Sequence, residues 1–301
     1  MGEGWGGGRP HMRAERPPLP APRPQGGRDH AAGASDAPPY VERLARTLRY
    51  NSAPAAASTH AVAVETPIQI AYGGQPFAVM MGTPADLEDF AAGFSLTEGI
   101  VERFDEIRAI EVELTTDSAR VNVTLSGDRL RAHLARRRAL VGRTGCGLCG
   151  VEDLAHLPRP RVRDRARRPP APAAIGAAVA ALDAHQPLNA LTRAVHGAAG
   201  CDARGEILLA REDVGRHNAL DKCIGALLRQ GAAADDGFLL VTSRCSYEMV
   251  AKAAAFGAAA LVSVSAPTSL ALQMAEAAGL ALIVTARRDG ALSFDSPGAP
   301  A

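Results

Sequence analysis

The spacing of apolar and polar residues is most regular in the last third of this 301-residue chain. There, apolar runs of strand length alternate with segments in which apolar residues recur at a helical period. The expected strands are 205–210, 237–243, 259–265 and 280–286, and the expected helices are 218–231, 246–257 and 267–279. Strands that alternate with helices of this length predict βαβ units, a mostly parallel sheet and the α/β class.

Two hairpins are expected nearer the N-terminus. Residues 61–82 read as two extended runs, with the Gly73-Gly74 pair making a tight turn between them. Residues 107–127 alternate in a way that is typical of a second hairpin. Together with a helix between them, these hairpins predict an α+β portion that precedes the α/β portion.

The helix between the hairpins is expected over residues 83–99. We expect Thr83 to cap it, Pro84 to occupy its first position and Asp86 to complete a start that resembles a capping box. Gly99 is expected to end it.

The chain is expected to divide into three parts. Residues 1–39 are rich in Gly, Pro and Arg and lack periodicity, so we expect a disordered tail, with ordered structure beginning near Ala61. Residues 40–170 form the expected N-terminal α+β portion, and residues 171–301 form the C-terminal α/β portion.

Composition narrows the function classes. The formal net charge is +1, so no global field attracts the chain to nucleic acid or to a membrane surface. Five cysteines without a secretory hydrophobic segment indicate reduced thiols and a cytoplasmic location. The apolar stretch 253–286 contains Ser, Pro and Glu residues and changes period, which favours buried strand, helix and strand over a membrane span.

Polar segments follow the ends of all four expected strands, at 211–218, 243–248, 265–269 and 287–290. In open α/β sheets, ligands bind beyond the carboxyl ends of the strands, where helix N-termini also point. Arginine and free backbone N–H groups at such an edge favour an anion or nucleotide site. The candidate residues in the first two segments are Arg216, His217, Asn218, Ser243 and Arg244. Taken singly, Asn218, Ser243 and Ser265 are better interpreted as ordinary helix caps, and it is their concentration at one edge that favours a binding site.

A pair of cysteines, Cys146 and Cys149, lies between glycines in the sequence GRTGCGLCGVEDL. Residues 127–170 around them hold twelve arginines against four acidic residues. Such a pair can bind half of a zinc site, form a redox disulfide, carry sulfur or be inert. Nearby arginines favour the thiolate. A thiolate that attacks a persulfide becomes a persulfide itself, and its neighbour can release that sulfur by forming a disulfide.

Four strings occur in a specific order along the chain. They are TGCGLCG at 144–150, EDVGRHNALDK at 212–222, SRCSYEMVAKAA at 243–254 and SVSAPTSLA at 263–271. With them, the chain resembles the FdhD family, the formate dehydrogenase accessory sulfurtransferases, from about Glu65 to Phe294.

The resemblance implies a role in molybdenum cofactor biosynthesis. Proteins of this family accept sulfur from a cysteine desulfurase as a cysteine persulfide, here on Cys146 with Cys149 assisting. They pass it to the molybdenum cofactor, bis-molybdopterin guanine dinucleotide, before that cofactor enters formate dehydrogenase. The resemblance also implies a C-terminal portion similar to the cytidine deaminase fold, and a homodimer.

The family's cofactor-binding segment falls on Thr285, Ala286, Arg287, Arg288, Asp289 and Gly290. The usual order in the family resembles Arg-Gly-acid-Arg, whereas this chain has Arg-Arg-Asp-Gly at 287–290. The altered order changes which contacts the segment can make, but it retains the guanidinium groups that the resemblance implies at this position.

Two alternatives remain open. The protein can act as a cofactor-binding chaperone that transfers no sulfur. A zinc deaminase would need His-x-Glu and Pro-Cys-x-x-Cys strings. His196 lacks the glutamate and no proline precedes Cys146, so the sequence argues against deamination.

Overall fold

The computed structural model describes residues 37–47, 57–131, 169–232 and 237–294 of the chain. All of them belong to one unit, Gly33–Ala301. Within these ranges the strands form sheets of two, four and six strands. No helix in the described ranges is both long enough and apolar enough to cross a membrane.

The first sheet is an antiparallel ribbon of β1 (Tyr40–Arg46) and β2 (Ala57–Ala63). Most of its side chains are exposed, including Leu44 and Val62. Regular structure thus begins well before Ala61, and the expectation that it would begin there was wrong. The ribbon buries no apolar face of its own, so the alternation that identifies half-buried strands is weak here.

The second sheet has the order β4-β3-β6-β5. Gly73 and Gly74 both have positive φ, as the predicted two-residue turn between β3 and β4 requires. Alternate residues of β3 and β6 point into the core, because successive side chains of a strand face opposite ways. The strands are β3 (Thr66–Tyr72), β4 (Gln75–Gly82), β5 (Ile107–Leu114) and β6 (Ala119–Leu125). Both predicted hairpins are confirmed.

Helix α1 (Leu87–Thr97) is confirmed, but its predicted start is wrong. Asp86 precedes the helix in a left-handed conformation, and no side chain caps it. The Thr83 hydroxyl instead accepts a hydrogen bond from the Val214 N–H, at 3.2 Å. A partner 131 residues away has therefore overridden the local capping pattern. Gly99 has positive φ and follows the helix end as predicted.

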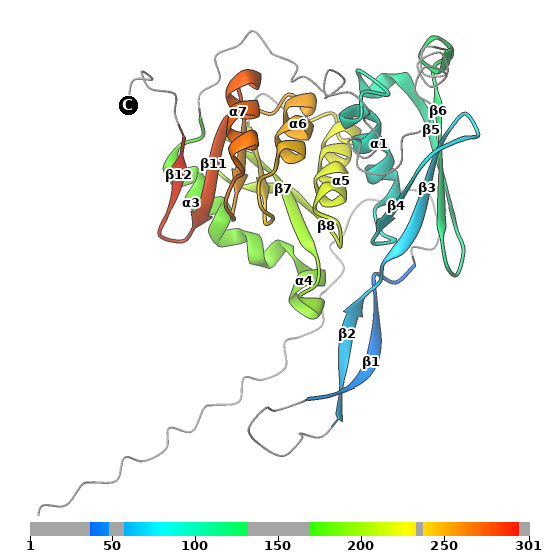
Figure 1. Cartoon of the computed structure of the whole chain (residues 1–301), viewed down its shortest axis with the longest axis horizontal. Coiled ribbons are helices and arrows are strands. Elements are labelled where there is room, and N and C mark those ends of the chain that lie inside the picture. Colours follow the sequence, from blue (N-terminus) through cyan, green and yellow to red (C-terminus); the bar gives the residue numbers. More distant parts are fainter. Residues whose placement is uncertain (1–36, 48–56, 132–168, 233–236, 295–301) are drawn as a thin grey trace, which may run out of the picture. The chain divides into compact units, whose positions relative to one another are not determined.

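The third sheet has the order β12-β11-β10-β9-β7-β8. Strands β9, β10 and β11 are parallel neighbours, and the helices α5, α6 and α7 cover one face of the sheet (Figure 1). Leu239 and Val241 of β9 pack in that helix-covered core, whereas Phe238 and Leu240 pack on the opposite side with α3. The α/β class is confirmed.

The sheet is mixed, because β7 lies antiparallel between β8 and β9 and β12 is antiparallel to β11. The sequence did not predict β7, whose residues HGAAGCD form no bulky apolar run. Small residues are needed there, because the side chains of Gln186 and Leu227 pack directly over Gly197 and Gly200. The strands are β7 (His196–Asp202), β8 (Ile207–Asp213), β9 (Gly237–Val241), β10 (Ala260–Ser263), β11 (Ala281–Arg287) and β12 (Gly290–Ser293).

Three of the remaining helices, α5, α6 and α7, lie close to the positions predicted for them, whereas α3 and α4 were not predicted. Those that cover the third sheet are α5 (Arg216–Arg229), α6 (Tyr247–Phe256) and α7 (Ser269–Ala278). The others are α3 (Pro172–Ala181), α4 (Pro187–Thr192) and the 3-10 turns η1 (Phe104–Glu106) and η3 (Leu182–His185).

Helices α1 and α5 pack against each other at very short range. A Cβ atom added at Gly93 would overlap the carbonyl oxygen of Asp221, and one added at Gly225 would overlap that of Asp89. One apolar core contains residues of the four-stranded sheet, of α1 and of α5. The predicted part boundaries at residues 39 and 170 stay predictions, since much of the chain beside them is outside the described ranges.

Candidate functional site

The carboxyl ends of four strands lie along one edge of the six-stranded sheet. Strands β8 and β9 run in the same direction, because both are antiparallel to β7, and β10 and β11 are parallel to β9. The strand-end rim is the name we give to the residues at and just after these ends, together with His196 at the start of β7. The residues are 213–218, 242–248, 263–269 and 285–290. The rim contains every described residue that the sequence suggested for ligand binding.

Asp213 anchors the first segment of the rim. Its Oδ2 atom lies 2.6 Å from Lys222 Nζ and accepts a hydrogen bond from the Thr83 N–H at 2.9 Å. Its Oδ1 atom accepts from the Gly215 N–H at 2.7 Å. The carboxylate is completely buried, and these partners hold the loop before α5 in one conformation.

Asn218 belongs to the same network. Its Nδ2 atom donates to the carbonyl oxygen of Met81 at 2.7 Å and to Asp213 Oδ1 at 3.1 Å. Both amide hydrogens therefore have partners, and the residue is 3% exposed. In this arrangement Asn218 ties the rim to the end of β4.

Arg216 and His217 form the first turn of α5. The residue before them is Gly215, which has no side chain to cap the helix. Within the described residues, Arg216 Nε and His217 Nε2 are buried and have no hydrogen-bond partner. These two atoms are therefore the candidates for contact with a polar ligand at this end of the rim.

Glu248, in the first turn of α6, faces His217. Its Oε2 atom lies 3.7 Å from His217 Nε2 and accepts a hydrogen bond from Ser246 Oγ at 2.8 Å. Burial lowers the pKa of His217 to about 4, and the positive charges of Arg216 and Lys252 act in the same direction. The imidazole is consequently neutral at neutral pH.

Glu248 lies in the predicted polar segment 243–248 but was not among the candidate ligand residues, and His196 was not placed at this edge of the sheet. Glu248 is visible within the string SRCSYE, whereas His196 was considered only as a zinc ligand. His196 lies opposite Asp213 in the β7–β8 ladder. Burial lowers the pKa of His196, and the charge of Arg216 lowers it further.

The second and third segments are joined through serine side chains. Ser263 Oγ donates to the carbonyl oxygen of Ser243 at 2.7 Å, and Ser243 Oγ donates to that of Arg244 at 3.1 Å. Ser243 is 4% exposed, whereas Arg244 is exposed. Of these residues, Arg244 presents its charge to solvent.

The last segment of the rim contains a β-bulge. Val284 lies opposite Leu292 and Arg287 lies opposite Gly290, so β11 has one extra residue at this point. Thr285 has a φ of 53°, and its N–H donates to the carbonyl oxygen of Ser265 at 3.0 Å. A β-branched residue is rare in this left-handed region, where strain of about 1–2 kcal/mol is expected.

The bulge leads into the turn between β11 and β12. Arg288 and Asp289 form the turn, and they are exposed together with Arg287 and Gly290, while Ala286 is buried. Strands β8 and β11 are four strand spacings apart, which is roughly 19 Å. The rim therefore has two groups of candidate residues, one around Arg216 and one around Arg287.

Cys146 and Cys149 lie outside the described residues. Of the cysteines that are described, Cys201, Cys223 and Cys245 are all free and buried. Burial raises the pKa of Cys245, which lies in the string SRCSYE, to about 12. A buried thiol with a raised pKa is a poor nucleophile.

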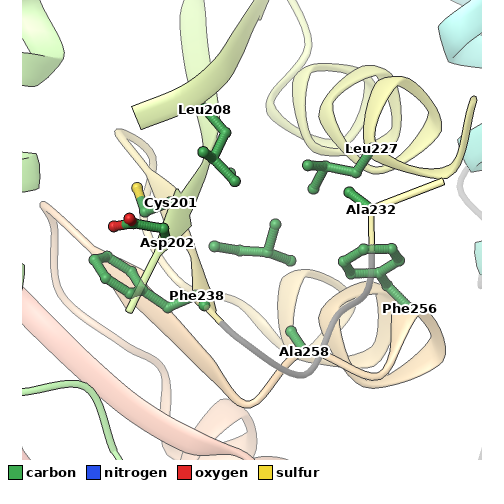
Figure 2. Close-up of a pocket in the computed structure, with 11 residues that line it drawn as sticks. Cys201, Asp202, Leu208, Leu227, Ala232, Phe238, Phe256 and Ala258 are labelled. Carbon is green, nitrogen blue, oxygen red and sulfur yellow. The ribbon is translucent and has the colours of Figure 1, made fainter. Parts of the chain in front are cut away.

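A separate cavity of about 80 Å³ lies at the amino end of β9. Figure 2 shows Leu227, Ala232 and Phe256 on one side of it and Cys201 and Phe238 on the other. Its lining is mainly apolar, and small-molecule sites usually measure about 300–1,000 Å³. The cavity is therefore too small and too apolar for a nucleotide.

No group of three His, Cys, Asp or Glu residues in the described ranges is placed to hold a metal ion. The cysteine pair that a zinc deaminase would use is not among those residues. The described fold and rim define an α/β protein with arginine, histidine and hydroxyl groups at its strand ends.

Comparison with known proteins identifies the family. The model of the FdhD/NarQ family matches residues 63–299, and the chain belongs to this family. A relative from Xanthomonas euvesicatoria pv. vesicatoria, named sulfur carrier protein FdhD, is 49% identical over 78% of this chain and 84% of its own length. A second protein of that name, from Bordetella petrii, is 47% identical over 81% of this chain and 87% of its own.

A solved structure agrees with the fold. It is that of a protein from Desulfotalea psychrophila, which its description assigns to the formate dehydrogenase accessory proteins. The TM-score is 0.67 and the sequence identity is 26%, over 87% of this chain and 99% of that one.

Proposed function

We propose that this protein is a sulfur carrier that serves the maturation of formate dehydrogenase. The observation that carries the proposal is membership of a family whose relatives bear the name sulfur carrier protein. The chemistry of the described cysteines supports it, because Cys201, Cys223 and Cys245 are buried. We assign the transfer to Cys146 and Cys149, which lie in the string TGCGLCG that the chain shares with the family.

In the proposed first step, the Cys146 thiolate attacks the outer sulfur of a persulfide on a cysteine desulfurase. A new S–S bond forms on Cys146, the donor's S–S bond breaks, and the donor leaves as a thiolate. The Cys149 thiolate then attacks the inner sulfur of the Cys146 persulfide. The two cysteines lose two electrons and form a disulfide, while the outer sulfur gains them and leaves as sulfide. A cellular dithiol reductant restores the pair.

The acceptor of that sulfur is the molybdenum cofactor, bis-molybdopterin guanine dinucleotide, which we treat as the substrate of the carrier. The strand-end rim supplies groups that suit its pyrophosphates, since arginine and helix N-termini both bind phosphate. We assign the phosphate-binding role to Arg216, His217, Arg244, Arg287 and Arg288. Thr285, Ala286, Asp289, Gly290, Asn218 and Ser243 are assigned to shaping or contacting the same surface.

The proposal places the protein in the cytoplasm as a homodimer, with a cysteine desulfurase and formate dehydrogenase as partners. A cofactor-binding chaperone is the second candidate function. The specific observation that favours it is that the rim contains two groups of polar residues which need no thiol to bind an anion.

Mass spectrometry after incubation with a cysteine desulfurase and cysteine tests sulfur loading. We expect an adduct of one sulfur atom on the wild-type chain and none on Cys146→Ala. Cys245→Ala is the matched control, because it removes a thiol that is completely buried, and it should load like the wild type. Loading of Cys146→Ala to the wild-type level would refute the assignment.

The maturation of formate dehydrogenase separates the carrier from the chaperone. Cys149→Ala should load sulfur but deliver it poorly, because the disulfide that releases sulfide cannot form. Full maturation by Cys146→Ala would instead favour the chaperone.

A further inference from the structure

The ribbon of β1 and β2 leaves one edge of β1 open. Among the described residues, β1 pairs with β2 and with no other strand. Its side chains from Glu42 to Arg46 are exposed, and Leu44 is 75% exposed, more than any other large apolar side chain in the described ranges. Two antiparallel strands without an apolar face are marginally stable in water, and further strands stabilise them. The ribbon therefore has the properties of an incomplete sheet.

The backbone of β1 is oriented for another strand. At the base of the ribbon, the Val64 N–H donates a hydrogen bond to the carbonyl oxygen of Pro39 at 2.9 Å. Hydrogen-bonded pairs alternate along an antiparallel ladder, so the N–H and C=O groups of Glu42, Leu44 and Arg46 point away from β2. The open edge of β1 thus presents donors and acceptors that a further strand can pair.

The side chains at this edge form a self-complementary pattern. Glu42, Leu44 and Arg46 point to the same face of β1, because successive side chains of a strand alternate. Glu42 and Arg46 are exposed, and neither forms an ion pair with another described residue. In an antiparallel pair of identical strands, a two-fold axis through Leu44 reverses the order of acid, leucine and base in one copy. Each glutamate is then opposite an arginine, on both sides of a leucine pair.

Other registers of the same pairing are less favourable. A pairing centred on Arg43 places two arginines directly opposite each other, and one centred on Glu42 does the same with two glutamates. Like charges in opposite positions destabilise a sheet, whereas opposite charges and apolar pairs stabilise it. A pairing centred on Ala45 forms no ion pair, because Leu44 is then opposite the partner's Arg46. The charge pattern of β1 thus favours the register centred on Leu44.

We infer that β1 pairs with β1 of a second copy of this chain, antiparallel and centred on Leu44, so that the two ribbons form one sheet in the order β2-β1-β1-β2. Glu42 of each copy then pairs with the partner's Arg46. The Arg43 guanidinium, which donates to the Glu42 carbonyl oxygen at 3.0 Å in the single chain, gives way to a strand hydrogen bond. The inference rests on the proposed function, which makes the protein a homodimer, and it assigns the strand that joins the two copies.

Sedimentation equilibrium of the full chain over a range of concentrations tests the pairing. The wild type should associate as a dimer. Glu42→Arg and Arg46→Glu should each weaken the dimer by about 10- to 100-fold, because each change places like charges opposite each other at two symmetric positions. Glu113→Arg is the matched control, because Glu113 is also an exposed acid in a strand, β5, and its reversal should leave the dimer dissociation constant unchanged.

Mixing the two single variants gives the sharpest measurement. In a mixed dimer, the introduced arginine of Glu42→Arg faces the introduced glutamate of Arg46→Glu, and the unchanged Arg46 faces the unchanged Glu42. We therefore expect native mass spectrometry to show more of the mixed dimer than of either dimer of a single variant. A chain that carries both substitutions should regain the association of the wild type. A general loss of stability would not be rescued by mixing, and a mixture that associates no better than the single variants would overturn the pairing.

The outcomes separate this inference from the proposed function. Equal association of the wild type, Glu42→Arg and Arg46→Glu would overturn the pairing through β1 and leave a homodimer that forms through another surface. The charges of β1 would then only protect an edge strand from aggregation. A wild type that stays monomeric at every concentration would overturn the pairing and the proposed homodimer together, whereas sulfur loading on Cys146 would still stand.

Discussion

Lys222 Nζ lies 2.6 Å from Asp213 Oδ2, and both side chains are completely buried. Lys222 also donates a hydrogen bond to the carbonyl oxygen of Thr83 at 2.9 Å. The pair thus joins β8, α5 and the segment between β4 and α1, and it fixes the loop that presents Arg216 and His217.

Removing one partner of this pair should destabilise the protein strongly. Lys222→Met leaves the Asp213 carboxylate buried without a counter-charge, so we expect a loss of about 3–5 kcal/mol in the free energy of unfolding. Urea denaturation measures it. Arg204→Met is the control, because its pair with Asp202 is exposed and should contribute less than about 1 kcal/mol. Equal effects of the two substitutions would contradict this account.

The contact between α1 and α5 should tolerate no side chain at its centre. Gly93→Ala would place a methyl group on the backbone of Asp221, so we expect a loss of several kcal/mol or failure to fold. Gly176→Ala, in helix α3, meets no atom within 4 Å and should stabilise the protein by about 0.5–1 kcal/mol. Thermal unfolding compares the two glycines, and a Gly93→Ala variant as stable as the wild type would disprove the close packing.

The bulge at Thr285 should be under strain. Thr285→Gly removes the side chain that disfavours positive φ and keeps the N–H that bonds to Ser265. We expect unfolding free energy to stay constant or to rise by about 1 kcal/mol, since relief of strain offsets the flexibility of glycine. Thr285→Val, which stays β-branched, should show no such gain in chemical denaturation. A clear loss of stability in Thr285→Gly would show that the side chain is held by favourable contacts.

His217 should make the stability of the protein depend on pH. Its pKa is lowered from 6.5 to about 4 by burial, so the unfolded chain binds more protons between these values. The stabilisation is fully present above about pH 6.5 and is lost as the pH falls towards 4. We expect His217→Gln to remove this part of the pH dependence, measured as the urea midpoint from pH 7 to pH 4. His60→Gln, in the exposed β2 strand, should retain it.

Some residues of the strand-end rim were predicted from the local sequence pattern, and others were not. Arg216, His217 and Arg287 were expected at the strand ends because the alternation of strand and helix places such segments at one edge of a sheet. Glu248 and His196 were missed as neighbours of Arg216, because they come from α6 and β7 and meet it only through the order of the strands. The cap assigned to Thr83 was wrong for a similar reason, since its hydroxyl has a partner in a distant loop.

The sequence by itself determined the α/β alternation, the Gly73-Gly74 turn and the family, because burial periodicity, positive φ and ordered short strings are local properties of the chain. Only the tertiary structure decided that β7 inserts between β8 and β9, that Asp213 pairs with Lys222, and that Glu248 faces His217. Those features depend on which elements pack together in space, and no local pattern encodes the resulting distances, burial or charge balance.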